Sequence, residues 1–366
     1  MSIAPRIFHL NLVGDVMLGR LIDQLLPARV TCSEDARQTA SLVRSYPEFQ
    51  SYGLRMPWGN KLLHFHTSHL NLINLETSVT TNSKPWPDKV FNYRMYPENI
   101  QCLKEARIDY ASLANNHTLD FSEEGLVETV RSSKDAGISF AGAGESREEA
   151  LRPAVLHLRQ ASGKDELELV LHVYSASDHP ADWSKIHGFN LIEYSTSPRS
   201  RLKSLLTAPP RTGRPQLKIF SVHWGPNYAW YPLDEIRNLA HYLIDECGVD
   251  IGVEAYKGKL IIYGCGDFID DYAVDNTYRN NFSAIWSVVV EDRRESRGIL
   301  QIKKLEVFPT RIKSFQVNLL ERNDRDHQWL QIKLTDLSWR YKTKVEEKLG
   351  DDSQIIVHVE DSSAQE

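Results

Sequence analysis

The sequence predicts an α/β fold in which helices cover a β-sheet. Strand-like apolar runs alternate with helical stretches through the first half of the chain, and this order is typical of a sheet with helices packed on it. Several of the apolar runs end in polar side chains that can bind ligands. The length of 366 residues is enough for one large domain with additions.

The first half contains three clear strands and two helices. Strands are predicted at residues 6–13, 68–75 and 109–114, where apolar side chains dominate. Helical spacing is found at 97–108 and, more clearly, at 122–137. In the second helix Ser122 is a plausible N-cap, and Gly137 follows the last turn where a C-cap glycine is expected.

The second half has a different order of elements. Residues 154–159 and 166–175 predict a hairpin, 216–225 a strand, and 232–248 a helix that ends at Gly248. Further strands are expected at 259–268 and 282–290, and 298–312 is predicted to complete a second sheet or its edge. We expect the main domain to span 1–320, followed by a helical or extended addition at 321–349 and a disordered acidic tail at 350–366.

Composition and charge restrict the class of protein. Hydrophobic residues make up 41% and charged residues 25% of the chain, as in a soluble globular protein. A formal net charge of −6 argues against nucleic acid or anionic membrane as a partner, although phosphate could be bound through a metal. The N-terminus enters a strand directly and no long apolar run follows, so we expect a cytoplasmic protein without a membrane anchor.

Four strand ends carry the residues that point to chemistry: Asp15, Glu76, Asn116 and His223. Ligands of open α/β sheets bind beyond the carboxyl ends of the strands, where residues distant in sequence converge. Two carboxylates, an amide oxygen and an imidazole form a ligand set suited to Mn²⁺, Fe or Zn²⁺. For each residue alone, a polar turn after a strand is the simpler interpretation.

Five motifs together resemble the CapA/PgsA family of capsule and poly-γ-glutamate synthesis proteins: GDVMLGR, NLINLET, SLANNHTLD, FSVHWG and, more weakly, YGCGDF. The resemblance runs from Arg6 to about Asp271. It implies a metallophosphatase (calcineurin-like phosphoesterase) fold, which is a four-layer α-β-β-α sandwich with mixed sheets inside. It also implies either metal-dependent phosphoester hydrolysis or a role in poly-γ-glutamate synthesis.

The resemblance assigns roles to the metal-binding candidates. Asp15 would bind a first divalent ion, Glu76 would take a bridging position, and Asn116 and His223 would bind a second ion. The protein would therefore carry one or two Mn, Fe or Zn ions.

The resemblance also suggests the residues that act on the substrate. His117 would face it as a general acid or would stabilise charge, with Asp120 holding the other imidazole nitrogen. An anionic small molecule or polymer is the expected substrate, and Arg20, Arg94 and Tyr228 are candidates for binding it. Structural ion pairing for the arginines and core packing for the tyrosine are the alternative interpretations.

One expected motif is absent from the sequence. The resemblance implies a GHxxH-type histidine motif between the helix ending near Cys247 and the strand at 259–268, but the sequence there is GVDIGVEAYKG. Only eight residues, 249–256, separate Gly248 from Lys257, which is short for two strands and a ligand loop. A lost loop, an alternative transcript or a gene-prediction error would each produce this sequence. The shortening leaves open a second function, that of a catalytically impaired or non-catalytic binding or assembly protein.

Overall fold

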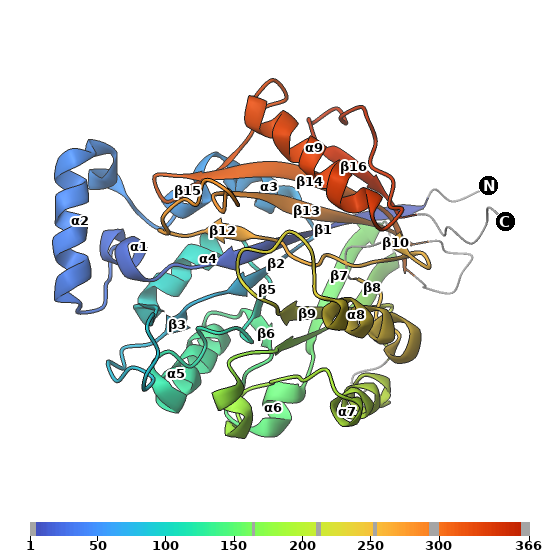
Figure 1. Cartoon of the computed structure of the whole chain (residues 1–366), viewed down its shortest axis with the longest axis horizontal. Helices are drawn as coiled ribbons and strands as arrows, with labels where there is room; N and C mark the ends of the chain where they lie inside the picture. The colour runs from blue at the N-terminus through green and yellow to red at the C-terminus, as the bar shows by residue number, and fades with distance from the viewer. Residues whose placement is uncertain (1–4, 163–164, 210–213, 252–254, 293–299, 360–366) are drawn as a thin grey trace.

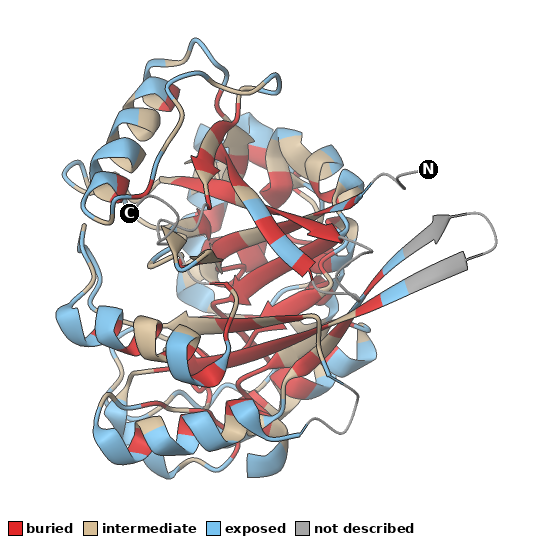
Figure 2. Cartoon of the chain, turned by 90° about the vertical axis from the view of Figure 1, so that its right-hand side faces the viewer, coloured by how far each residue is buried: buried red, intermediate tan, exposed pale blue. Residues whose placement is uncertain are grey.

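Two β-sheets face each other at the centre of the protein, and helices cover their outer faces (Figures 1 and 2). The computed structural model describes residues 5–162, 165–209, 214–251, 255–292 and 300–359. The order of layers is helix, sheet, sheet, helix, with parallel and antiparallel pairing inside. The predicted α/β class is confirmed, and the arrangement is consistent with a metallophosphatase-like fold.

The larger sheet has nine strands and holds both termini of the described chain. Its strand order is β15 (Gln316–Leu319), β14 (Leu300–Lys313), β13 (Phe282–Asp292), β1 (Arg6–Val16), β2 (Leu70–Leu75), β5 (Tyr110–Ser112) and β6 (Ser139–Ala141), with β12 (Asp267–Ile269) beside β1 and β16 (Ile355–His358) beside β14. The three strands predicted in the first half are confirmed. The prediction that 298–312 completes a second sheet is wrong, because β14 pairs antiparallel with β13 in this first sheet.

Parallel pairing brings the carboxyl ends of three strands of this sheet to one edge. In the register of β1, Asp15 lies opposite Asn74 of β2 on one side and opposite Asp267 of β12 on the other. Gly14 makes the close approach to β12 possible, because a Cβ atom there would lie 1.8 Å from the carbonyl oxygen of Gly266. The amide of Asp15 donates a 3.0 Å hydrogen bond to that same oxygen.

The smaller sheet consists of β7 (Ala154–Ser162), β8 (Asp165–Ser177) and β9 (Leu217–His223). Strands β7 and β8 form the predicted antiparallel hairpin, and β9 runs parallel to β8 and ends at His223. Alternate apolar side chains of both sheets, including Leu10, Leu72, Leu171 and Ile219, are buried against each other between the layers. This packing places the end of β9 opposite the ends of β1 and β2.

Helices form the two outer layers, and α9 lies against β14. On the larger sheet they are α1 (Arg20–Leu25), α2 (Ser33–Ser45), α3 (Leu62–Thr67), α4 (Gln101–Glu105) and α5 (Ser122–Asp135), with the 3₁₀ turns Pro47–Ser51, Met56–Lys61 and Pro97–Ile100. The rest are α6 (Arg147–Leu151), the 3₁₀ turn Ala181–Lys185, α7 (Thr196–Thr207), α8 (Asp234–Cys247) and α9 (Arg325–Trp339). None of the helices in the described ranges has the length and apolar character needed to cross a bilayer.

The predicted ends of α5 and α8 are confirmed only in part. Gly137 and Gly248 follow these helices with positive φ angles, as expected for C-terminal glycines. Ser122, however, is the first helical residue of α5 and has a φ of 66°, while Phe121 occupies the N-cap position without a side-chain cap. The Ser122 hydroxyl instead donates to the Glu124 carboxylate.

The segment that follows α8 is joined to β9 by a single β-bridge at Ile251. Ile251 forms single parallel bridges with Ile219 of β9 and with Leu260 of β11 (Lys259–Leu260), which pairs with β10 (Ala255–Tyr256). The expected absence of a histidine loop falls partly on residues 252–254, which lie outside the described residues. Short strands β3 (Ser78–Val79) and β4 (Arg94–Met95) pair on the opposite side of the molecule.

The C-terminal part differs from the predicted disordered tail. Strand β16 pairs antiparallel with β14, and Ile355 and Val357 are each 1% exposed. The prediction of disorder is therefore wrong for Ile355–His358, because alternating apolar residues complete the interior between the sheets. The segment also contains acidic residues such as Asp351 and Asp352. Its overall composition therefore predicts disorder although it includes a short alternation of apolar residues. Residues 360–366 lie outside the described part.

Replacing Ile355 by alanine tests the role of β16. Because Ile355 is buried between the sheets, we expect Ile355→Ala to lower the free energy of unfolding by about 2–5 kcal/mol. Denaturant unfolding measures the change. The half-buried neighbour Ile356 is the matched control, and Ile356→Ala should cost clearly less. Equal and negligible effects of both substitutions would contradict the pairing of β16.

Candidate functional site

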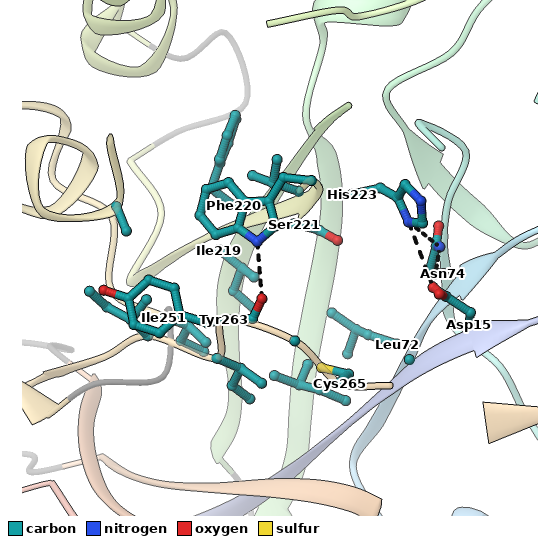
Figure 3. Close-up of a pocket in the computed structure, with 18 of the residues that line it drawn as sticks. Asp15, Leu72, Asn74, Ile219, Phe220, Ser221, His223, Ile251, Tyr263 and Cys265 are labelled. Carbon is teal, nitrogen blue, oxygen red and sulfur yellow. Dashed lines mark hydrogen bonds and ion pairs between the residues drawn. The ribbon is translucent and has the colours of Figure 1, made fainter. Parts of the chain in front are cut away.

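Polar side chains from both sheets meet where β1, β2 and β9 end (Figure 3). The Asn74 amide nitrogen lies 2.5 Å from Asp15 Oδ1 and 3.3 Å from His223 Nδ1. His223 Nδ1 in turn lies 3.8 Å from Asp15 Oδ1. The structure thus brings together two of the four predicted metal ligands, Asp15 and His223, with Asn74 between them.

Glu76 and His117 form the second part of the site. Glu76 follows β2, and its Oε1 lies 3.9 Å from His117 Nε2, while its Oε2 accepts a 3.3 Å hydrogen bond from the Tyr272 hydroxyl. Both Glu76 and His117 are buried. The carboxylate of the third predicted ligand therefore faces the imidazole that the sequence suggested as an acid.

Asp120 holds His117 in place, as the sequence predicted. Its Oδ2 lies 2.6 Å from His117 Nδ1 and accepts a 2.6 Å hydrogen bond from the amide of Tyr93. Lys89 pairs with Asp120 Oδ1 at 2.6 Å. The Tyr93 ring stacks on the imidazole with centroids 4.1 Å apart. These contacts hold the imidazole in position with Nε2 directed toward Glu76.

The two asparagines before His117 have different surroundings. Asn115 is fully buried, donates to Asn74 Oδ1 and to the Leu75 carbonyl, and accepts from the His117 amide. It is a structural residue of the turn. Asn116 Oδ1 is buried without a hydrogen-bond partner among the described residues. A buried amide oxygen without a donor is costly, and a bound cation would satisfy it.

Carboxylates at this edge raise one another's pKa values. Burial raises the pKa of Asp15 to about 6, although its hydrogen bond to Asn74 lowers it, and nearby Asp270 raises it further. Burial and Asp15 raise the pKa of Asp267 to about 7, and burial and Asp267 raise that of Asp270 to about 8. Burial, followed by Asp15 and Asp267, also raises the pKa of Glu76 well above its usual value. A divalent cation would relieve this repulsion.

His223 has the opposite shift. Burial, with smaller contributions from His179 and His117, lowers its pKa to about 3, so the imidazole is neutral near pH 7. A neutral imidazole is the form that binds metals. Burial also lowers the pKa of His117, although its bond to Asp120 raises it.

These residues fit a divalent ion only in part. Asn116 offers a free buried oxygen, and the carboxylates lack a neutralising charge. Within the described ranges, however, no three histidine, cysteine, aspartate or glutamate side chains form a ready metal-binding group. The donors present therefore suit an ion that completes its shell with water or substrate oxygens, and the binding of a metal stays a prediction.

The three predicted substrate-binding residues lie in different surroundings. Arg20 pairs with Asp271 at 3.4 Å and lies 5.5 Å from the ring of Tyr93, which stacks on His117, so it stands at the border of the site. The Arg94 guanidinium donates to the carbonyls of Thr81, Asn82 and Thr31. These bonds favour the structural alternative for Arg94. Tyr228 is 55% exposed, on the loop after β9.

Sequence reasoning missed several residues of the site: Lys89, Tyr93, Asp270 and Tyr272. They come from irregular segments, where no periodicity indicates the direction of a side chain. Asn74 was visible beside Glu76 in the strand-end motif, but it was not selected as a site residue. Asp267, in the weakly matching YGCGDF motif, lies opposite Asp15.

A cavity of about 240 Å³ lies beside Asp15, Asn74 and His223 (Figure 3). Its walls are mainly aliphatic and come from β9, from the shortened segment at Ile251 and from the chain that leads to β12 through Tyr263 and Cys265. The cavity therefore occupies the side of the site where the expected histidine loop is absent.

Comparison with known proteins identifies the family of the chain. Residues 9–272 match the family described as bacterial capsule synthesis protein PGA_cap. A probable polyglutamine synthesis accessory protein of Mycobacterium tuberculosis is 29% identical, with 93% of this chain and 94% of the relative covered. The capsule biosynthesis protein CapA of Bacillus anthracis is 26% identical, covering 76% of this chain and 66% of the relative. The PGA biosynthesis protein CapA of Bacillus subtilis is 23% identical, covering 71% and 63%. The resemblance predicted from the motifs is confirmed, and the chain belongs to the bacterial capsule synthesis protein family.

Proposed function

We propose that this protein acts in the synthesis of a capsule-type poly-γ-glutamate polymer, through metal-dependent chemistry on an anionic substrate at the ends of β1, β2 and β9. Relatives named for capsule and PGA biosynthesis support the role in polymer synthesis. The comparisons do not favour the alternative of a purely non-catalytic assembly protein. Hydrolysis of a phosphoester or a related bond is the reaction type that suits the site.

The observation that carries the proposal is the pairing of two unlike halves at one edge of the sheets. One half offers Asp15 and His223 as ligands, the other offers His117 held by Asp120, and Asn116, next to His117 in the chain, adds a buried amide oxygen without a hydrogen-bond partner among the described residues. When bound, a divalent ion would supply charge neutralisation and a water of lowered pKa. Glu76 lies between the halves, because it follows β2 and faces His117 Nε2 at 3.9 Å.

The role proposed for His117 follows from its surroundings. Asp120 pairs with Nδ1, which leaves Nε2 directed into the site, where the doubly protonated imidazolium can donate a proton to a leaving oxygen or stabilise the charge on it. Lys89 neutralises the second oxygen of Asp120. The imidazole is thus oriented by the buried Lys89–Asp120 ion pair, and its Nε2 is the nitrogen that faces Glu76.

Conservative changes to the carboxylates test the metal ligands. Asp15→Asn and Glu76→Gln keep the side-chain size but remove a negative charge. We therefore expect each substitution to lower the affinity of the protein for Mn²⁺ or Zn²⁺ by about tenfold or more. Elemental analysis after dialysis measures the metal content. Asp109→Asn, at a partly buried carboxylate away from the site, is the control and should leave metal content unchanged. Full metal retention in both site variants would refute the ligand assignment.

Replacing His117 separates proton transfer from metal binding. We expect His117→Ala to lower turnover of phosphoester substrates by about 100-fold or more, because the positioned acid is lost, while the metal content stays nearly intact. A screen of phosphoesters with added Mn²⁺ identifies the substrate for this assay. Turnover at the wild-type rate in the variant would exclude the role of His117.

The arginines provide a third test. Because Arg94 is bonded to three backbone carbonyls, we expect Arg94→Ala to lower the free energy of unfolding by about 1–2 kcal/mol with little change in KM. Arg20→Ala, at the border of the site, should instead raise KM for an anionic substrate. Thermal unfolding and steady-state kinetics on both variants distinguish the two roles, and a raised KM for Arg94→Ala alone would reverse the assignment.

A further inference from the structure

Aromatic and cationic side chains gather on the surface next to the site, where the loop after β9 meets α9. We define this cation–aromatic surface by Tyr228, Trp230, Tyr231, Tyr278, Lys333 and Arg340. The Tyr278 ring lies between the other two large rings, with centroids 5.3 Å from Tyr228 and 5.6 Å from Trp230. Tyr228 and Tyr231 are 55% and 39% exposed, so the rings are open to solvent on one side.

The two cations of this surface are held by rings. Lys333 Nζ lies 3.8 Å from the centroid of Trp230, and Arg340 Cζ lies 3.7 Å from that of Tyr231. Neither forms an ion pair with a carboxylate of the described residues. An aromatic ring orients a cation without neutralising its charge, and both charges therefore remain available to an external anion. Arg279 nearby is different, since Asp326 binds it at 2.6 Å.

The surface is connected to the site through packed rings. The loop that carries Tyr228, Trp230 and Tyr231 begins directly after His223. Trp224 donates from its indole nitrogen to the carbonyl of Tyr263, and the Tyr263 ring lies 5.5 Å from Tyr341, next to Arg340. A chain-like ligand on the surface would therefore lead to the end of β9.

The surface also combines two parts of the sequence. The loop lies within the residues that match the family, 9–272, whereas α9 (Arg325–Trp339) and Arg340 lie beyond them. Figure 1 shows α9 over β14 and β16, apart from α7. The addition after the matched residues thus supplies the two free cations to a loop of the site.

We propose that the cation–aromatic surface binds the polymer itself, an extended γ-linked polyamide chain with a free α-carboxylate on each unit, and leads it to the site. This inference rests on the proposed function. The carboxylates of such a chain pair with Lys333 and Arg340, and its methylene groups lie on the ring faces of Tyr228 and Tyr231. The net charge of −6 of the whole chain makes this local pair of cations the feature that selects an anion here.

Binding of labelled poly-γ-glutamate, followed by fluorescence anisotropy, tests the inference. We expect the double variant Lys333→Ala/Arg340→Ala to bind about tenfold more weakly at low salt, because two exposed ion pairs are lost, and to show a weaker dependence on salt. Trp230→Ala should also weaken binding, since Lys333 loses the ring that orients it. Thermal unfolding checks that the variants are folded.

Two controls make the outcome specific. Lys185→Ala changes an exposed lysine in another part of the molecule and should bind as the wild type does. Asp15→Asn should lose metal but keep polymer binding, so a failure of the metal proposal would leave this test intact. Unchanged affinity in the double variant would overturn the inference. Equally tight binding of a labelled single-stranded DNA would also overturn it, because base stacking on the rings would then explain the surface.

Discussion

The parallel register of β1 with its two neighbours is the constraint on which the site depends. Gly14 lets β1 approach the chain before β12, and in the resulting register Asp15 lies beside both Asn74 and Asp267. A shift of one residue would turn the Asp15 side chain to the other face of the sheet. The ladder that stabilises the larger sheet therefore also fixes the position of the first carboxylate, and folding and function cannot be separated at this point.

Electrostatic repulsion between buried carboxylates at this edge destabilises the folded state, and the rest of the fold must offset it. Several buried carboxylates face one another there, and each raises the pKa of the next. Their repulsion is tolerated because the sheets and helices bury two large apolar clusters, one between the sheets and one beneath the helices of the larger sheet. On the His117 side, by contrast, Lys89 neutralises the buried Asp120. The site thus combines one half that needs an added cation with one half whose charge is already balanced.

The sequence predicted the features that follow from strand ends and missed those that follow from irregular chain. Asp15, Glu76 and His223 could be placed because each ends an apolar run, and the pairing of His117 with Asp120 could be placed because they share a short turn. Lys89 and Tyr93 could not, since they lie in a segment without periodicity. Strand β16 was missed because only two of its side chains face the interior, within an acidic stretch. Arg94 is a candidate because of its charge, whereas its three carbonyl partners come from two segments, Thr81–Asn82 and Thr31, that only the folded chain brings together.

Residues that line the cavity beside His223 differ in how well they tolerate a larger side chain. At Gly14, a single added carbon would collide with backbone, so no larger residue can be accommodated without moving β12. The cavity of about 240 Å³ that Gly14 helps to line is also lined by aliphatic side chains of β9 and α8, which border open space rather than backbone. The space next to the ligands can therefore be reshaped by changes to single side chains of β9 and α8, whereas a change at Gly14 would disturb the register of β1. Differences in substrate size between relatives are expected to arise on the side that has room for them.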